Sequence, residues 1–138
     1  MTSNASSGPT SPSRPRILVD HSLGRVAVPA FFRAAGYSTT TIVEMFGRPG
    51  VPDVEWIEES GRLGLVVAHK DARIRYRPAG KQAVIAARLR LLCLTSGNLT
   101  ADEQVQRFRV NLPAIERWWD KPGPWILAVR RTGVQGLL

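Results

Sequence analysis

Three aspartates lie at positions from which a folded chain could bring their carboxylates together. Asp20 directly follows the apolar residues 17–19, Asp71 comes shortly after another apolar segment, and Asp53 follows a Val-Pro pair. Two carboxylates about 4 Å apart repel each other by about 4 kcal/mol at an effective dielectric constant of about 20, so a cluster of them needs a cation. Oxygen ligands without a cysteine cluster or a histidine pair fit a hard ion, and we expect Mg²⁺ (or Mn²⁺) as the cofactor.

Each aspartate also has a structural alternative that requires no metal. Asp53 could only cap a helix, and Asp20 could hydrogen-bond to the turn that follows it. Asp71 could form an ion pair with Arg73 or Arg75. The choice between these alternatives and a shared cation depends on whether the fold places the three acids at one edge.

Three further polar residues are secondary candidates for the same site. Glu44 comes after the second expected strand and is a possible fourth acid, although it could equally be solvated. Ser22 could orient Asp20 or a bound water, or it could make a turn hydrogen bond. His69 is expected to be structural or to face solvent, because a single histidine in the motif is weak support for a general base.

Apolar segments rich in β-branched residues alternate with amphipathic segments from residue 16 onward. Strands are expected at residues 16–20, 37–43, 63–69, 88–95 and 124–129. Helices are expected at 26–36, 53–62 and 81–87, and a further helix begins at the capping box of residues 100–103 and is interrupted or restarted at Pro113. Loops are expected at 46–52 and 77–80.

This alternation predicts an α/β fold, a three-layer α/β/α domain with a mostly parallel central sheet. Ligands of such sheets bind beyond the carboxyl ends of the strands. Asp20 and Asp71 follow the first and third expected strands. A crossover helix runs antiparallel to its strands, so Asp53 at the start of a helix belongs to the same edge. The three acids are therefore expected on one rim of the sheet.

Length and composition indicate one globular domain with a short tail. The chain has 138 residues, of which 43% are hydrophobic and 22% charged, an ordinary mixture for a soluble domain. Residues 1–15 are mainly Ser, Thr, Pro, Gly and Asn and are expected to be disordered, so the domain is expected at residues 16–138. The net charge of +8 favours a polyanionic partner such as nucleic acid.

The single cysteine and the short apolar segments argue against disulfide-linked, cysteine-rich zinc-binding and membrane-spanning proteins. Cys93 is the only cysteine, so neither an intrachain disulfide nor a cysteine-rich zinc site can form. No apolar run approaches the ~18 residues that cross a membrane, and no signal-peptide core is present at the start. We therefore expect a cytoplasmic protein without a membrane partner.

Three segments that carry these acids resemble the acidic motifs of PIN-domain ribonucleases. They are VDHSL at 19–23, PDVEWI at 52–57 and VVAHKDARIR at 66–75. Within that family the chain is similar to the compact PIN-like proteins that serve as VapC-type toxins of type II toxin–antitoxin pairs. The resemblance covers residue 16 to about residue 130, with the motifs in the family's order.

The third motif departs from the common family pattern. Many PIN domains carry Thr-x-Asp-x-Asp-Phe after a late strand, whereas here His69 stands at the Thr position, Asp71 at the first Asp and Arg73 at the second. This departure removes one acid that could bind metal. The number of bound ions therefore stays open.

The resemblance implies a metal-dependent endoribonuclease that hydrolyses RNA phosphodiesters. It implies that Asp20, Asp53 and Asp71 are the catalytic and metal-binding residues, with Glu44 as a further metal candidate. It also implies a small antitoxin protein as partner, and a homodimer is an open possibility. Beside the expected rim lie Lys70, Arg73 and Arg75, which could bind RNA phosphates or could form a solvated loop that balances the acids.

Functions of other classes fit the residues less completely. A haloacid-dehalogenase-like phosphatase requires an acid two positions after its first Asp, where Ser22 stands here. A receiver-like signalling domain requires a late lysine, and residues 88–138 offer only Lys121. A non-catalytic nucleic-acid-binding or interaction module would explain the charge but not the three acids.

Three tryptophans lie near the C-terminus, at positions 118, 119 and 125. Trp118, Trp119 and Trp125 are expected to pack the last helix on the last strand, although a partly exposed one could bind an antitoxin.

Overall fold

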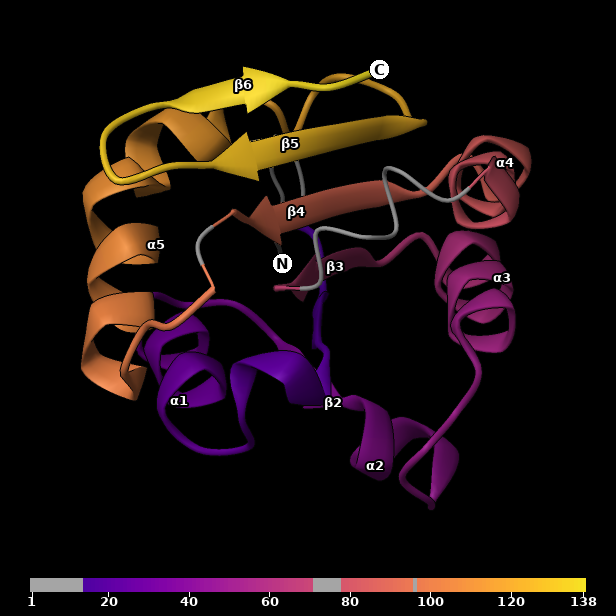
Figure 1. The fold of residues 1–138 in the computed structure, drawn as a ribbon, viewed down its shortest axis with the longest axis horizontal. Helices are drawn as coiled ribbons and strands as arrows, with labels where there is room; N and C mark the ends of the chain where they lie inside the picture. The colour runs from indigo at the N-terminus through magenta and orange to yellow at the C-terminus, as the bar shows by residue number, and fades with distance from the viewer. Residues whose placement is uncertain (1–13, 71–77, 96) are drawn as a thin grey trace, which may run out of the picture.

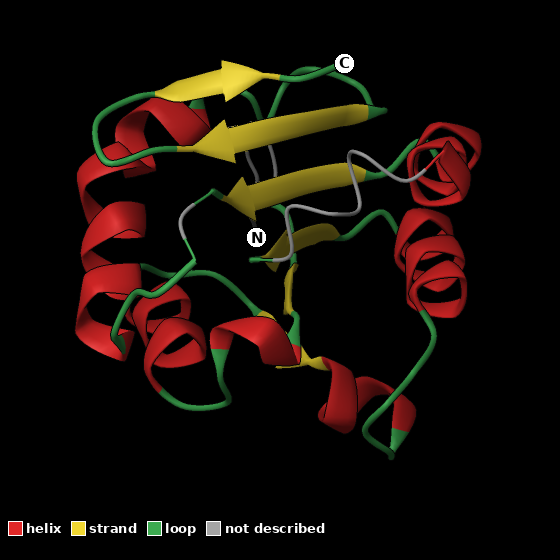
Figure 2. Cartoon of the chain, viewed as in Figure 1, coloured by secondary structure: helices red, strands yellow, loops and turns green. Residues whose placement is uncertain are grey.

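A single sheet forms the middle layer of the protein. The computed structural model describes residues 14–70, 78–95 and 97–138. The strands in these residues are β1 (Ile17–Val19), β2 (Thr39–Thr41), β3 (Val66–His69), β4 (Arg90–Leu94), β5 (Trp125–Val129) and β6 (Val134–Gly136). Their order across the sheet is β2-β1-β3-β4-β5-β6 (Figures 1 and 2). All neighbouring strands pair in parallel except β5 and β6, which confirms the predicted mostly parallel sheet.

Helices cover both faces of this sheet, so the predicted three-layer architecture is confirmed. They are η1 (His21–Leu23), α1 (Ala27–Ala34), α2 (Ile42–Phe46), α3 (Asp53–Leu63), α4 (Pro78–Ala87) and α5 (Ala101–Glu116). One face packs on α1 and α5, and the other face packs on α2, α3 and α4 (Figure 1). Within the described residues, none of the helices combines the length and the apolar character needed to cross a membrane.

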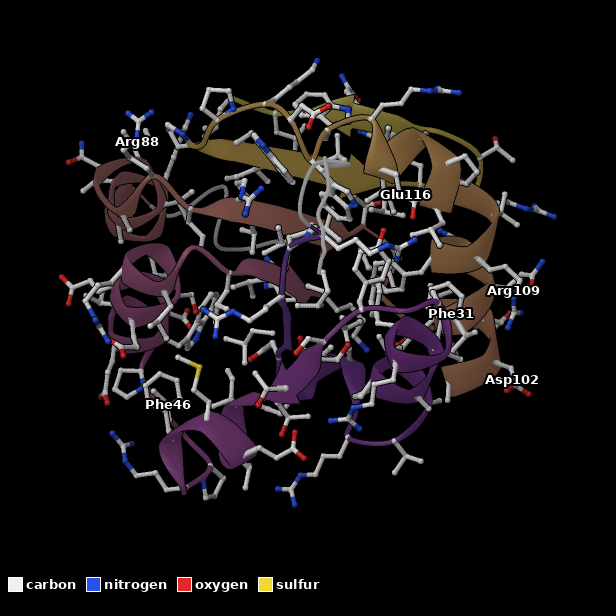
Figure 3. The ribbon with its side chains drawn as sticks, turned by 180° about the vertical axis from the view of Figure 1, so that it is seen from behind. Phe31, Phe46, Arg88, Asp102, Arg109 and Glu116 are labelled. Carbon is white, nitrogen blue, oxygen red and sulfur yellow. The ribbon has the colours of Figure 1, made fainter. Side chains whose placement is uncertain are left out.

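The central strands are continuous apolar runs because they are buried on both faces. Along β1, Ile17 and Val19 join the core beneath α1 and α5, whereas Leu18 joins the core beneath α3 and α4. Cys93 of β4 is buried in the second core, as expected of a small apolar group in a strand. Figure 3 shows Arg109 of α5 beside Phe31 of α1, with the guanidinium carbon 5.4 Å from the ring centroid.

Two predicted elements end or begin differently in the structure. The strand expected at 37–43 is limited to β2, because Thr41 and Glu44 form a capping box that starts α2 directly after it. The loop expected at 77–80 is wrong for its last three residues, since α4 already begins at Pro78. Proline suits a first helical position because its missing N–H needs no partner there.

The C-terminal part also differs from the prediction. α5 runs through Pro113 without interruption, and Phe108 and Ile115 on either side of it are both fully buried in one core. This shared burial outweighs the hydrogen bond that proline removes. The strand expected to be last is followed by β6, a short antiparallel edge strand with one half-buried residue, which an apolar pattern could not reveal.

The first described residues pack on the domain rather than extending the expected tail. Arg14 donates from Nη1 to the carbonyl oxygen of Ala35 at 2.9 Å, and its guanidinium carbon lies 4.4 Å from the centroid of the Tyr37 ring. Pro15 is buried. Arg14 and Pro15 therefore contact the domain predicted to begin at residue 16, and residues 1–13 lie outside the described residues.

Close packing of α3 on α4 gives the first testable prediction. A Cβ atom added to Gly61 would overlap the carbonyl oxygen of Ala87 and would lie 2.7 Å from the Ala87 Cβ. Gly61→Ala should therefore lower the free energy of unfolding by about 1–2 kcal/mol, because this overlap outweighs the ~1 kcal/mol that alanine ordinarily gains in a helix. Urea unfolding measures the difference.

Gly97→Ala is the matched control, since an added Cβ there meets nothing within 4 Å and the residue lies in a loop. Its free energy of unfolding should stay within about 0.5 kcal/mol of the parent. Equal stability of the two variants would contradict the close approach of α3 and α4.

Candidate metal and nucleic-acid site

Asp20 is a buried carboxylate at the carboxyl end of β1. Its residue is 6% exposed, and its backbone N–H donates to the carbonyl oxygen of Ala68 at 2.9 Å, which extends the pairing of β1 with β3. The chain then turns into η1, and Asp20 is the N-cap of that short helix. The Asp20 carboxylate accepts a hydrogen bond from the backbone N–H of Ser22, which is the turn hydrogen bond that was one alternative for it. The same carboxylate lies at the rim of the sheet, so the turn hydrogen bond does not exclude a ligand there.

Ser22 connects Asp20 to the end of β3. Asp20 Oδ2 accepts from Ser22 Oγ at 2.5 Å and from Ser22 N at 3.2 Å. The same Ser22 Oγ accepts from the backbone N–H of Lys70 at 3.0 Å. The hydroxyl therefore acts as donor and acceptor at once, and it fixes the carboxylate against the residue that follows β3. Both roles proposed for Ser22, orienting Asp20 and closing a turn, are present.

The second oxygen of Asp20 faces the exposed side of the site. His21 Nδ1 lies 3.4 Å from Asp20 Oδ1, and the His21 side chain is more than half exposed. Among the described residues, His21 is the side chain that lies near this oxygen. Asp20 therefore has one oxygen that accepts from Ser22 and one that lies outside those hydrogen bonds.

Asp53 is linked to the end of β3 through Trp56. It is the first residue of α3 and is exposed, and its Oδ1 accepts from Trp56 Nε1 at 3.0 Å. Trp56 is buried, and its ring centroid lies 6.1 Å from that of His69, the last residue of β3. His69 is buried as well, which confirms a structural role for it and excludes exposure to solvent.

Asp20 and Asp53 therefore each contact one residue that contacts the end of β3. Ser22 links Asp20 to Lys70, and Trp56 links Asp53 to the adjoining His69. Asp71 is the next residue in the sequence after Lys70. Asp71, Arg73 and Arg75 lie outside the described residues.

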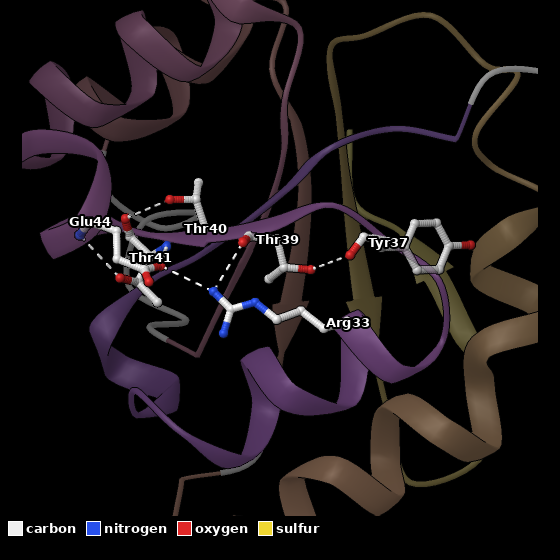
Figure 4. A network of polar contacts seen from close by, with 6 residues as sticks. All are labelled: Arg33, Tyr37, Thr39, Thr40, Thr41 and Glu44. Carbon is white, nitrogen blue, oxygen red and sulfur yellow. Dashed lines mark hydrogen bonds and ion pairs between the residues drawn. The ribbon is translucent and has the colours of Figure 1, made fainter.

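Glu44 is occupied by contacts of its own (Figure 4). Its Oε1 accepts from the backbone N–H of Thr41 at 2.9 Å and from Arg33 Nη2 at 3.2 Å. The hydrogen bond from Thr41 and the charge of Arg33 lower the pKa of the Glu44 carboxyl. These contacts favour a capping role over metal binding.

No three His, Cys, Asp or Glu side chains gather closely enough to hold a metal ion in the part of the chain that the structure describes. Asp20 and Asp53 are two of the three predicted metal ligands, and Asp71, the third, lies outside that part. Sequence reasoning missed Trp56, although its position three residues after Asp53 puts both on one face of a helix.

The tryptophans near the C-terminus pack on one another, as the default expectation holds. The Trp118 ring centroid lies 5.5 Å from that of Trp125, and the Trp119 ring stacks on Trp125 with centroids 6.5 Å apart. Trp119 Nε1 donates to the hydroxyl of Tyr37 at 2.9 Å. These contacts join the end of α5 to β5 and to the segment between α1 and β2.

The two hydrogen bonds of Ser22 Oγ predict a stability effect that needs no metal. Ser22→Ala should lower the free energy of unfolding by about 1–3 kcal/mol, because it removes the shorter of the two Ser22 hydrogen bonds to Asp20 Oδ2 and the acceptor of the Lys70 N–H. Urea unfolding in EDTA measures this. Ser38→Ala is the control, since Ser38 is exposed. Equal stability of the two variants would contradict the bridge.

Comparison with known proteins shows the family to which the chain belongs. Residues 15–96 match the family model described as "PIN like domain". A Mycobacterium tuberculosis (strain ATCC 25618 / H37Rv) protein named "Putative ribonuclease VapC45" is 34% identical to this chain over 125 residues, which are 88% of this chain and 91% of that protein. No solved structure matches the chain. The matched residues contain β1, α3 and β3, and the chain belongs to the PIN-like domain family.

Proposed function

We propose that this protein is a metal-dependent endoribonuclease and the toxin of a toxin–antitoxin pair. The observation that carries this proposal is the convergence of Asp20 and Asp53 on the end of β3, directly before Asp71, in a chain of the PIN-like family. The name of the similar mycobacterial protein supports both the RNA substrate and the toxin role.

Asp20, Asp53 and Asp71 are the proposed ligands of one or two divalent cations, Mg²⁺ or Mn²⁺. The donor set fits such an ion, because carboxylate oxygens are its preferred ligands and Asp20 keeps one oxygen outside the Ser22 hydrogen bonds. When bound, the ion neutralises charge on the scissile phosphate and lowers the pKa of an attacking water.

The protein's own contribution is to hold the carboxylates in place before substrate arrives. Ser22 fixes Asp20 Oδ2, and Trp56 fixes Asp53 Oδ1, so neither side chain has to be ordered during the reaction. Burial of Asp20 among β1 and β3 limits the water that competes for it. Such fixed geometry is what positions a phosphodiester for in-line attack.

Cationic residues next to the acids are the proposed contacts to RNA. Lys70, Arg73 and Arg75 follow β3 directly in the sequence, and the whole chain carries a net charge of +8. Phosphate contacts of this kind supply sequence-independent affinity that falls with salt. A small antitoxin that covers the acidic rim is the proposed protein partner, a homodimer is proposed as the assembly, and the cytoplasm is the proposed place of action.

Metal binding can be tested by the stability of Asp20→Asn. Asparagine keeps a side-chain oxygen for Ser22 but removes the charge, so the variant should be as stable as the parent in EDTA or more stable. Mg²⁺ should stabilise the parent by about 2.7 kcal/mol at about 100 times its Kd, and the variant much less. Thermal melts with EDTA and with Mg²⁺ measure this, and RNA cleavage should be lost.

Asp120→Asn is the matched control, because Asp120 is exposed and distant in the sequence from the proposed ligands. It should keep the full response to Mg²⁺. The metal site would be wrong if Asp20→Asn, Asp120→Asn and the parent all responded equally.

The toxin role predicts an effect on cell growth. Expression of the chain alone in a bacterial host should slow growth, and Asp20→Asn should relieve this at equal protein level. Co-expression of a small protein encoded beside it should restore growth. Normal growth with abundant, folded parent protein would contradict the toxin role, and it would leave the proposed metal site untested by this experiment.

A further inference from the structure

A pocket of about 490 Å³ lies beyond the carboxyl ends of β4 and β5, at a distance from the acids. Leu99 borders it from the segment after β4, and Arg131 and Thr132 border it from the turn after β5. The remaining wall is α5, with Arg107 and Val110 among its residues. In Figure 1 these segments meet where β4 and β5 point toward α5.

Asn111 fixes the two arginine-bearing walls against each other. Its buried side chain donates from Nδ2 to the carbonyl oxygen of Arg107 at 2.8 Å and to that of Arg130 at 2.7 Å. Its Oδ1 accepts from the backbone N–H of Gly133 at 2.7 Å. The turn that carries Arg131 is thereby held on α5, so the pocket exists before any ligand binds.

The charge of this pocket is positive. No ion pair involves Arg107 or Arg131 among the described residues, whose ion pairs are found on α1 to α3 and at Asp20. Glu103 also lines the pocket, but its Oε1 accepts from the backbone N–H of Thr100 at 2.8 Å in the capping box of α5. Two guanidinium groups therefore line the pocket together with one carboxylate, whose pKa is lowered by its hydrogen bonds with Thr100 and by the charge of Arg107.

The pocket and the acidic site share one edge of the sheet. Val19, Ala68, Leu92 and Leu127 form one row of paired residues across β1, β3, β4 and β5. Neighbouring strands are about 4.8 Å apart, so the end of β5 lies about 14 Å from the end of β1 along this edge. A single strand of RNA bound at Asp20 can span that distance with a few nucleotides.

We propose that the pocket is a second RNA subsite, in which Arg107 and Arg131 bind a backbone phosphate several nucleotides from the scissile one. The planar guanidinium group of arginine can donate two hydrogen bonds to the oxygens of one phosphate, so arginine suits phosphate recognition. Val110 is 49% exposed and offers an apolar surface to a ribose or base. This subsite rests on the proposed ribonuclease function and extends it to the length of substrate that the protein recognises.

The test compares two double variants that each remove two positive charges. Arg107→Gln with Arg131→Gln changes the pocket, whereas Arg88→Gln with Arg117→Gln changes exposed residues outside it. Figure 3 labels Arg88 beside α4, far from α5. Fluorescence anisotropy in EDTA measures binding of a dinucleotide and of a single-stranded RNA about twelve nucleotides long, over a series of salt concentrations.

The pocket variant should bind the longer RNA about 10-fold more weakly than the parent. Its plot of log K against log salt should be less steep by about 0.7, because the two arginines bind one phosphate of the single strand. Binding of the dinucleotide should be unchanged, because it cannot reach both sites. The control variant should differ from the parent by less than about 2-fold at moderate salt, and both variants should melt at the parent's temperature.

Two outcomes would overturn the subsite. One is equal affinity and equal salt slope of the pocket and control variants for the longer RNA. The other is unchanged RNA binding together with lost binding of a polyglutamate peptide, which would assign the pocket to an acidic protein partner. A third result separates the subsite from the proposed function. If the parent fails to cleave RNA with Mg²⁺, but the pocket variant still binds the longer RNA more weakly than the parent and the dinucleotide equally well, the ribonuclease function is wrong and the pocket stands as an RNA-binding site.

Discussion

Parallel pairing of β1 with β3 is the contact on which the candidate site depends. The register joins Val19 to Ala68, so the two strands end at the same level and the residues after them meet. Asp20 and Lys70 are brought together by this pairing, and Ser22 then joins them. A slip by one residue would turn each β1 side chain to the other face, so the two apolar cores also fix the position of Asp20.

Burying a carboxylate costs free energy because the charge loses its hydration. At Asp20 few side-chain contacts offset this loss. Asp20 is almost fully buried, yet the contacts to its side chain come from Ser22 and His21 alone within the described residues. A buried anion gains most from a nearby cation, because the low dielectric strengthens their attraction. Asp53 differs, since it is exposed and lies at the positive end of α3. A cation shared by the two would meet one buried ligand and one exposed ligand, each oriented by a side-chain hydrogen bond.

Much of the fold follows from the sequence because its strongest signals are local. Apolar runs mark the buried strands, and their alternation with helices fixes the parallel sheet and therefore the edge that holds Asp20 and Asp53. The elements that were missed depend on weaker or longer-range signals. Thr41 and Glu44 form a capping box that the β-branched residues around it obscure, and β6 has only one half-buried side chain. Pro113 stays helical because of tertiary packing at Phe108 and Ile115, which no local rule contains.

The same distinction explains why the positions of Asp20 and Asp53 in the fold could be predicted and the pocket could not. Asp20 and Asp53 are tied to strand and helix ends, which the sequence marks directly. Arg107 and Arg131 are 24 positions apart on α5 and on the turn after β5, and those segments are joined by core packing of α5 on the sheet and by the hydrogen bonds of Asn111. Asn111 is a polar residue on the buried side of α5, where an apolar residue would ordinarily pack. A buried amide whose three hydrogen bonds join two basic segments holds both at a fixed separation, which is what recognition of an extended polyanion requires.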